Sequence, residues 1–383
     1  MRGAGALIAA CLAAACGESA LQPDAPAASA DAAPDSAADA APDSPPDADD
    51  GEARRAVLAL MERVADWQIS QLEGNSASTW EEATFYAGLV ATYTSTGELR
   101  FFEDLFDWGE RNGWTPRVDR MHPDNQCAGQ TYLELHLLDG VPAHLGGTRQ
   151  VMDQALAQDR RGRDVWWWCD ALFMAPTVLA RLGAATDDPA YAAALHAKWW
   201  DVRDALYDPD EDLFFRDASY LRARCPNGAK MFWSRGNAWV VAGTVRVLQY
   251  LPADDPQRGR YVELLRRMAA RLASLQRPDG FWSSCLTDAA AYPEPETSGT
   301  AGFVYAMAWG VNEGLLDRDA YLPVIRRGWR ALVGAVDDRG KLHWVQKVGS
   351  APATTISDDT RPYGVGLFLL AASEVARLAA DLE

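Results

Sequence analysis

The chain has 383 residues, of which 48% are hydrophobic, so it can bury a large core. Its 54 acidic residues outnumber its 36 basic ones and give a formal net charge of −18 at pH 7. Such an excess of negative charge argues against nucleic acid as a partner, because contacts to phosphates need clustered Lys and Arg.

Residues 1–16 have the pattern of a lipoprotein-type signal peptide. Arg2 precedes an apolar, alanine-rich run from Ala4 to Ala15, which is too short to span a bilayer and ends at Cys16. We expect cleavage before Cys16 and attachment of lipid to it, so that the protein is exported and anchored to a membrane. The alternative is plain secretion after cleavage nearby.

Residues 17–52 differ in composition from the rest of the chain. They repeat Ala, Pro, Asp and Ser and hold ten acidic residues but no basic ones, which predicts a disordered acidic linker. Residues 53–383 show no second linker and are predicted to form one large domain. Without the linker and Arg2, 44 acidic and 35 basic residues remain. This balance still permits an anionic sugar as ligand, because one local arginine can outweigh a distant net charge.

The predicted domain is all-helical. Apolar residues recur at helical spacing nearly throughout, and strand-like alternation is confined to a few loops. The twelve predicted helices lie near 53–73, 79–95, 98–112, 127–138, 144–158, 169–183, 188–206, 235–250, 256–276, 298–313, 318–335 and 361–380. Successive helices would pair into hairpins.

The two helices of each predicted hairpin differ in kind. The first members, such as 261–271, are amphipathic and have one charged face. The second members, such as 300–310, are apolar and small on all sides, as expected of a helix that is buried all round. Alternating outer and inner helices predict an (α/α)6 barrel, a toroid of six helical hairpins.

The inner helices of such a barrel run parallel, so their N-termini gather on one face. The segments that lead into these N-termini are rich in polar and aromatic residues: 79–82, 124–127, 168–170, 233–239, 292–298 and 358–363. The long loops 207–233, 277–297 and 336–360 open on the same face. Because loops held by a rigid scaffold often carry function, we predict an aromatic-lined pocket with acids and arginines there.

The most informative of these segments is Trp166-Trp-Trp-Cys-Asp170. Aromatic faces can stack on sugar rings, and burial beside them raises the pKa of a carboxyl group. Asp170 is therefore a candidate acid that keeps its proton near neutral pH. The alternative is that Asp170 only caps a helix beneath a core aromatic cluster.

A family resemblance rests on six motifs, which occupy residues 167–176, 233–239, 279–282, 293–301, 308–317 and 363–375. As a set they resemble glycoside hydrolase family 105, the unsaturated rhamnogalacturonyl hydrolases, which are related to the unsaturated glucuronyl hydrolases of family 88. The likeness covers essentially all of 53–383.

The resemblance implies a particular reaction. Family members remove the 4,5-unsaturated uronic acid that polysaccharide lyases leave at the non-reducing end of their products. An acid protonates C4, water adds at C5, and the resulting hemiketal opens and releases the rest of the chain. By resemblance Asp170 carries the proton, and Asp124, at the head of the preceding inner helix, is its partner acid. Once ionised, Asp170 would take a proton from the attacking water.

Four residues are predicted to bind the sugar from their chemistry and their place in these motifs. Arg235 suits the uronate carboxylate, because a guanidinium binds it bidentately and stays charged. Its alternative role is an ion pair or a tie between helix and loop. The aromatic rings of Trp168, Trp233 and Trp239 are candidate stacking faces, although each ring could instead belong to the core.

Two further residues are predicted near the site. Some family members carry a histidine on the loop after the seventh helix, whereas residues 213–217 hold none. Arg216 is predicted to take its place, which leaves the exact sugar and linkage open. His122 lies two residues before Asp124 and is the only one of the five histidines near the predicted site.

The cysteines do not suggest a metal site. Those of the predicted domain (Cys127, Cys169, Cys225 and Cys285) form no CxxC motif and lack paired histidines, so we expect no zinc. Cys225 and Cys285 fall in long loops, where a disulfide between them is one option in an exported protein. The reaction needs only carboxyl groups and water, so no cofactor or metal is expected.

The sequence thus predicts a glycoside hydrolase for unsaturated oligosaccharides, with galacturonyl products of rhamnogalacturonan or pectin lyases first. Alternatives are an unsaturated glucuronyl hydrolase for ulvan or glycosaminoglycan products, and a non-catalytic surface lipoprotein that binds glycans. An inverting hydrolase or a sugar epimerase on the same barrel is a third, although an epimerase should show paired histidine bases. The sequence does not indicate the oligomeric state.

Overall fold

The computed structural model describes residues 48–72, 77–117 and 122–382. The predicted signal peptide and nearly all of the predicted linker lie outside the described residues. Residues 48–383 form one compact unit. The first helix, α2, spans Ala48–Leu72 and so begins five residues before the predicted start of the domain. No helix in the described part of the chain is long and apolar enough to cross a membrane.

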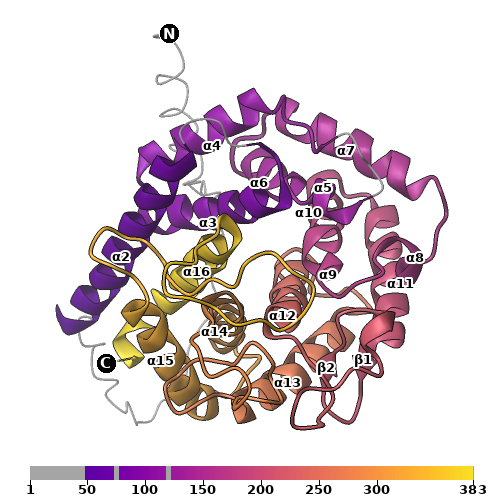
Figure 1. Ribbon diagram of the computed structural model, residues 1–383. Coiled ribbons are helices and arrows are strands. Elements are labelled where there is room, and N and C mark those ends of the chain that lie inside the picture. The colour runs from indigo at the N-terminus through magenta and orange to yellow at the C-terminus, as the bar shows by residue number, and fades with distance from the viewer. Residues whose placement is uncertain (1–47, 73–76, 118–121, 383) are drawn as a thin grey trace, which may run out of the picture. The chain divides into compact units, whose positions relative to one another are not determined.

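Two concentric rings of helices make up this unit (Figure 1). The outer helices are α2, α4 (Leu99–Arg111), α7 (Ala143–Leu156), α11 (Pro189–Leu206), α13 (Arg258–Ser274) and α15 (Arg318–Gly334). The inner helices are α3 (Trp80–Thr96), α6 (Gly129–Asp139), α10 (Pro176–Thr186), α12 (Ser234–Leu248), α14 (Thr297–Asn312) and α16 (Pro362–Val375). The predicted (α/α)6 barrel is confirmed.

The inner ring closes because its helices are small and apolar on every side. Each inner helix contacts the next, and α16 returns to α3. At that closure Gly366 packs directly on the backbone of α3, since a Cβ atom there would lie 2.2 Å from the carbonyl oxygen of Thr84. Every residue of α12 is buried, whereas α13 buries only one face, as their sequences predicted.

Two inner helices are shorter than predicted. The predicted helix 169–183 is broken into α9 (Ala171–Met174) and α10, because Pro176 has no N–H to donate to the preceding turn. The predicted helix 127–138 becomes α6, and a separate turn, α5 (Pro123–Gln126), precedes it and carries Asp124. The remaining short elements are α8 (Gly162–Val165), the 3-10 helices η1 (Ala218–Tyr220) and η2 (Ala379–Asp381), and the antiparallel pair β1 (Tyr207–Asp208) and β2 (Leu213–Phe214).

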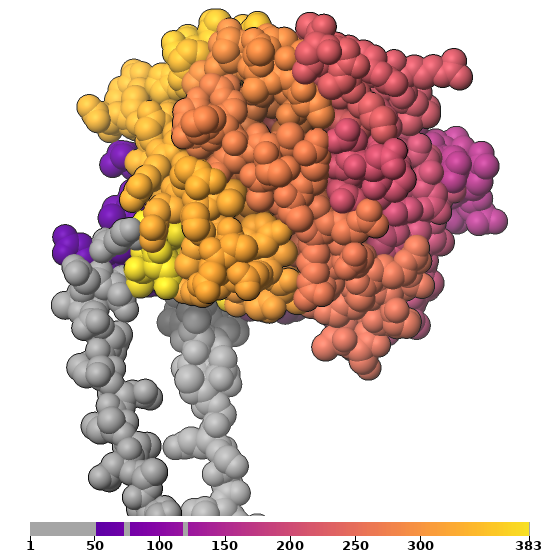
Figure 2. All heavy atoms as spheres, turned by 90° about the horizontal axis from the view of Figure 1, so that it is seen from below, coloured from indigo at the N-terminus to yellow at the C-terminus, as the bar shows by residue number. Residues whose placement is uncertain are grey.

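The three long loops gather on one side of the unit and are tied together. They form the upper edge in Figure 2, where red, orange and gold surfaces adjoin. A disulfide between Cys225 and Cys285, which the sequence left open, joins the first two loops. The third loop is held through Gln346, whose Oε1 accepts hydrogen bonds from Trp233 Nε1 at 2.9 Å and Ser284 Oγ at 3.0 Å.

Candidate active site

Asp170 stands directly before α9, and only 8% of it is exposed. Its carboxylate makes no capping hydrogen bond to the helix, so the alternative role as a simple N-cap is not supported. Instead it accepts a hydrogen bond of 3.4 Å from the thiol of Cys169. The backbone of this motif is fixed to the 207–233 loop, because Cys169 N donates to Arg216 O at 2.8 Å and Trp168 forms a bridge to Asp217.

Asp124 lies beside Asp170, because the turn α5 packs against α9. Burial and the negative charge of Asp170 together raise the pKa of Asp124 to about 7, although the charge of Arg216 opposes this. Burial also raises the pKa of Asp170, against the lowering effect of Arg216 and Arg235. Two like charges in one desolvated place resist joint ionisation. The pair therefore retains one proton up to neutral pH.

His122 is at the position that the sequence predicted. Its Nδ1 lies 3.7 Å from Asp124 Oδ2, and its ring centre lies 5.0 Å from that of Trp168. The His122 side chain is 41% exposed, so it stands at the rim of the acid pair. Its part in the reaction stays a prediction.

Arg216 also lies at the acid pair, as the sequence predicted. Its Nη1 donates to Asp217 Oδ2 at 2.5 Å, and its guanidinium lies over the ring of Trp167 at 5.0 Å. Burial alone would raise the pKa of Asp217, but hydrogen bonds from Ser219 and Arg216 outweigh it and lower that pKa. Arg216 thus brings a fixed positive charge toward Asp170 and Asp124.

Arg235 takes the second of its two predicted roles. It is 1% exposed, and it donates to the carbonyl oxygens of Gln346 at 2.5 Å and Lys347 at 3.0 Å and to the hydroxyl of Tyr363 at 3.1 Å. These contacts tie the start of α12 to the 336–360 loop. Three of its five N–H donors serve these partners, so the structure supports the tie, and direct binding of a uronate stays a prediction.

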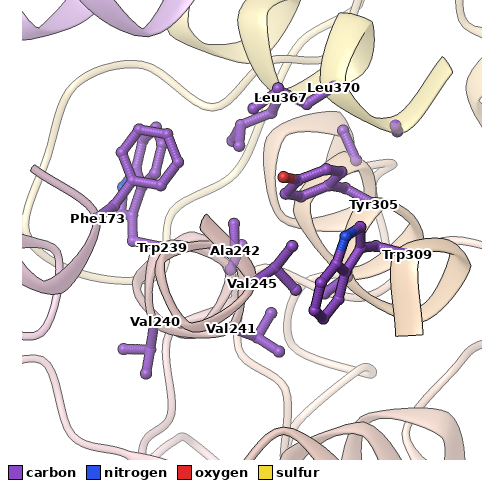
Figure 3. Packing of buried hydrophobic residues seen from close by; sticks show 14 of the residues in the cluster. Phe173, Trp239, Val240, Val241, Ala242, Val245, Tyr305, Trp309, Leu367 and Leu370 are labelled. Carbon is purple, nitrogen blue, oxygen red and sulfur yellow. The ribbon is translucent and has the colours of Figure 1, made fainter. Parts of the chain in front are cut away.

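The three tryptophans predicted to stack on sugars are all buried: Trp168 is 4% exposed, Trp233 2% and Trp239 1%. Trp239 packs beside Phe173 at 4.9 Å between ring centres (Figure 3) and contacts Trp80 edge-on. These rings offer no open face to a sugar, so the stacking prediction is corrected to a packing role. The buried rings exclude water from the neighbourhood of the Asp124 and Asp170 carboxyl groups.

Sequence reasoning missed Trp167 at the site and a further acid with a raised pKa, Glu81. Trp167 is 46% exposed, although it belongs to the motif that drew attention to Asp170. Three successive tryptophans give no periodic signal for which ring faces outward. Glu81, near the start of α3, has a pKa raised by burial and partly restored by the charge of Arg361. The polar segment 79–82 was the available signal for it.

The described part of the chain holds no second centre that combines these features. In the described part of the chain no group of three or more His, Cys, Asp or Glu residues is arranged to hold a metal. A cavity of about 560 Å³ lies at the C-terminal ends of the inner helices, lined by Glu134, Arg246, Tyr250 and Tyr305, among others. It contains none of the predicted site residues. There Glu134 accepts hydrogen bonds from Arg181 and Arg246, an arrangement that suits the negative ends of helices.

Comparisons with known proteins agree with this architecture. A family model described as "Glycosyl Hydrolase Family 88" matches residues 53–379. The chain is 32% identical over 351 residues to an "Unsaturated 3S-rhamnoglycuronyl hydrolase" from Formosa agariphila, covering 86% of this chain and 93% of that relative. A protein of the same name from Alteromonas sp. is 33% identical over 347 residues, covering 82% and 84%.

Solved structures give the same result. A "Glycosyl hydrolase family 88 from Bacteroides vulgatus" matches with a TM-score of 0.81 and 32% identity, covering 85% of this chain and 99% of the other. The unsaturated glucuronyl hydrolase from Bacillus sp. GL1 matches with a TM-score of 0.61 at 16% identity, over 84% and 96% of the two chains. At that identity the second match shows the fold alone.

Proposed function

The chain belongs to glycosyl hydrolase family 88, and we propose that it removes a 4,5-unsaturated uronic acid from the non-reducing end of oligosaccharides by hydrating the C4=C5 bond. The observation that carries this proposal is the buried pair of Asp124 and Asp170, in which burial raises the pKa of both carboxyl groups and brings that of Asp124 to about 7. An enol ether is protonated at carbon, so the acid must be neutral at working pH and shielded from water.

The proposed reaction needs one carboxyl group, which donates a proton and takes one back, and consumes one water molecule. Asp170 gives its proton to C4, and water adds at C5 while the ionised Asp170 takes a proton back. The product at C5 is a hemiketal, which opens and releases the remaining sugar. Asp124 supports this cycle, because two like charges in one desolvated place are disfavoured and one of the two carboxyl groups therefore keeps its proton. Direct hydrolysis would instead use two carboxyl groups with fixed, opposed roles.

For the substrate, we favour an unsaturated uronic acid linked to rhamnose. Two relatives that are 32% and 33% identical to this chain are named unsaturated 3S-rhamnoglycuronyl hydrolases. These names support rhamnose as the sugar next to the unsaturated uronic acid, and they leave the glucuronyl and galacturonyl alternatives raised from the sequence open. In both rhamnoglycuronyl and rhamnogalacturonyl substrates the sugar released from the uronic acid is rhamnose.

The test follows the ultraviolet absorbance of the C4=C5 bond in the full-length protein. Substrates are unsaturated disaccharides made by ulvan, rhamnogalacturonan and glycosaminoglycan lyases. The proposal expects loss of absorbance with the parent, and loss of activity by about 10²-fold or more in Asp170→Asn. Asp254→Asn, at an exposed aspartate between α12 and α13, is the matched control and should behave as the parent. Absence of any loss with all substrates would favour the glycan-binding alternative.

We also propose that the protein is exported and anchored by lipid on Cys16. What supports this is the short apolar run that ends at Cys16, followed by an acidic segment without bases. Metabolic labelling with a radioactive fatty acid should mark the parent protein and not Cys16→Ser. Unlabelled, fully released parent protein would instead indicate plain secretion.

A further inference from the structure

Cys169 is a buried free cysteine directly beside Asp170. It is 0% exposed, and its Sγ donates a hydrogen bond of 3.4 Å to Oδ2 of Asp170. Burial, reinforced by the negative charge of Asp170, raises the pKa of the Cys169 thiol well above its usual value. The group therefore stays an S–H donor at neutral pH, and in this form it is a poor nucleophile and a poor metal ligand. Its chemistry in this place is that of a hydrogen-bond donor.

The surrounding structure fixes the thiol against the carboxyl group. The backbone N–H of Cys169 donates to the carbonyl oxygen of Arg216 at 2.8 Å, which ties it to the 207–233 loop. On the side of α12, a Cβ atom added to Gly236 would lie only 3.0 Å from Sγ, so the missing side chain of this glycine leaves room for the sulfur. Two parts of the chain thus hold the S–H group beside Asp170.

A hydrogen bond to one oxygen of a carboxyl group decides which oxygen carries the proton. A protonated carboxyl group has one hydroxyl oxygen and one carbonyl oxygen, and the carbonyl oxygen is the better acceptor. Because the thiol donates to Oδ2, the proton of Asp170 is favoured on Oδ1. When the Oδ1–H bond breaks and the proton passes to C4 of the sugar, negative charge spreads to Oδ2, where the S–H group stabilises it.

We propose that Cys169 is a positioning residue, which keeps the transferable proton of Asp170 on Oδ1 and stabilises the carboxylate that forms when the proton leaves. This inference rests on the proposed function, in which Asp170 is the acid. A thiol is a weak donor, whereas a strong donor to the carboxylate would favour the ionised acid. Other charged groups that face this acid and its thiol are Asp124 on α5, Arg216 and Asp217 on the 207–233 loop, and Arg235 on α12.

The test measures kcat and kcat/KM at pH 6 and pH 8, with full-length proteins and the unsaturated disaccharide on which the parent is most active. Cys169→Ala should lower kcat about 3- to 10-fold at pH 6, as expected of one lost hydrogen bond. Because the carboxylate also loses a donor, the pKa of Asp170 should rise. The ratio of kcat/KM at pH 8 to that at pH 6 should therefore increase about 3-fold.

Two further variants separate this role from packing. Cys169→Ser keeps a donor, and a stronger one, so it should recover part of the lost kcat and return the pH ratio to the parental value or below it. Cys127→Ala is the matched control, because Cys127 is the other buried free thiol and it accepts a hydrogen bond of 3.4 Å from Nε2 of Gln130 instead. It should keep the parental kcat and the parental pH ratio.

The infrared S–H stretching band gives a readout that does not depend on activity. The band of Cys169, assigned by its loss in Cys169→Ala, should move to higher frequency in Asp170→Ala, since the thiol loses its acceptor. An unmoved band, or a pH ratio in Cys169→Ala equal to that of the parent, overturns the positioning role. Inactivity of the parent on every unsaturated disaccharide would instead refute the proposed function, even where the band shows the hydrogen bond.

Discussion

Asp124→Asn should make the protein more stable in alkaline solution. In the folded state the pKa of Asp124 is raised from 3.8 to about 7 by burial and by the charge of Asp170. In the unfolded chain it ionises near its ordinary value of about 4. Between these two values the folded state binds one proton more than the unfolded state, so the free energy of unfolding falls as pH rises from about 4 to about 7. Below pH 4 the carboxyl group is neutral in both states, so it adds no pH dependence to the free energy of unfolding.

The size of the effect follows from the shift. About 3 pH units at roughly 1.4 kcal/mol each give an upper limit of about 4 kcal/mol. Since the side chain of Asp124 is 25% exposed, we expect about 2–4 kcal/mol. An asparagine does not titrate. Relative to the parent, Asp124→Asn should therefore be unchanged near pH 4 and more stable by that amount at pH 8, while losing activity.

The assay is urea-induced unfolding of parent and variant at pH 4 and pH 8, with the free energy extrapolated to water. Asp217→Asn is the control of opposite sign, because the pKa of Asp217 is lowered by Ser219 and Arg216, so its removal should cost stability at pH 8. His122, which faces the same carboxyl group, is kept in every protein. The explanation is refuted if the free energies of unfolding of variant and parent differ by the same amount at pH 4 and pH 8. It is also refuted if Asp124→Asn is less stable than the parent at pH 8.

Four further predictions concern catalysis and the scaffold. The kcat/KM of the parent should be highest below about pH 7 and fall above it, as the catalytic pair loses its shared proton; a flat profile to pH 9 would contradict this. Arg235→Lys should lower the free energy of unfolding by about 1–3 kcal/mol in urea, since two loop carbonyls lose their donor; an unchanged value would remove the proposed tie. Replacing Cys225 and Cys285 by serine should lower the free energy of unfolding by about 4 kcal/mol, because the disulfide joins residues 60 positions apart. The check is the melting temperature of the parent with and without reductant, and an unchanged melting temperature would argue against the bond. Gly366→Ala should lower the melting temperature, because its Cβ would meet the backbone of α3, whereas Gly334→Ala, with open space around it, should not; equal melting of both would contradict the close approach.

Much of the barrel was readable from the sequence because its two rings have different apolar patterns. Outer helices such as α13 expose one charged face, and inner helices such as α14 expose none, so the alternation alone specifies six hairpins. The break between α9 and α10 was also written in the sequence, at Pro176, and was overlooked because the apolar pattern runs on through it. The periodicity of apolar residues indicates which residues are buried, but it does not show whether the helix is interrupted.

For the site residues, the fold explains which residues meet, but the sequence does not show how each side chain is oriented. Asp170, Asp124 and Arg216 meet because each lies close to the N-terminus of an inner helix or on the loop that pairs with it, which the fold alone determines. The role of Arg235 was not predictable, because its acceptors are the backbone carbonyls of residues 346 and 347, more than a hundred positions away. The orientation of Trp167 was not predictable either, since three adjacent rings of equal hydrophobicity carry no pattern. Residue types and the order of the helices can be interpreted from such a sequence, whereas the orientation of individual side chains cannot.

The interrupted helix explains how an acid at this face can stay protonated. The N-terminus of a long helix favours a negative charge, since its free N–H groups and dipole stabilise a carboxylate. Glu296 illustrates this at α14, a helix of 16 residues, where it accepts hydrogen bonds from Ser298 N at 2.9 Å and Gly299 N at 2.7 Å. Asp170 precedes α9, a helix of only four residues, and makes no such bond. The first N–H groups of α9 already donate to the carbonyl oxygens of residues 168–170, so they do not stabilise an ionised Asp170. Burial therefore raises the pKa of Asp170 without an opposing cap.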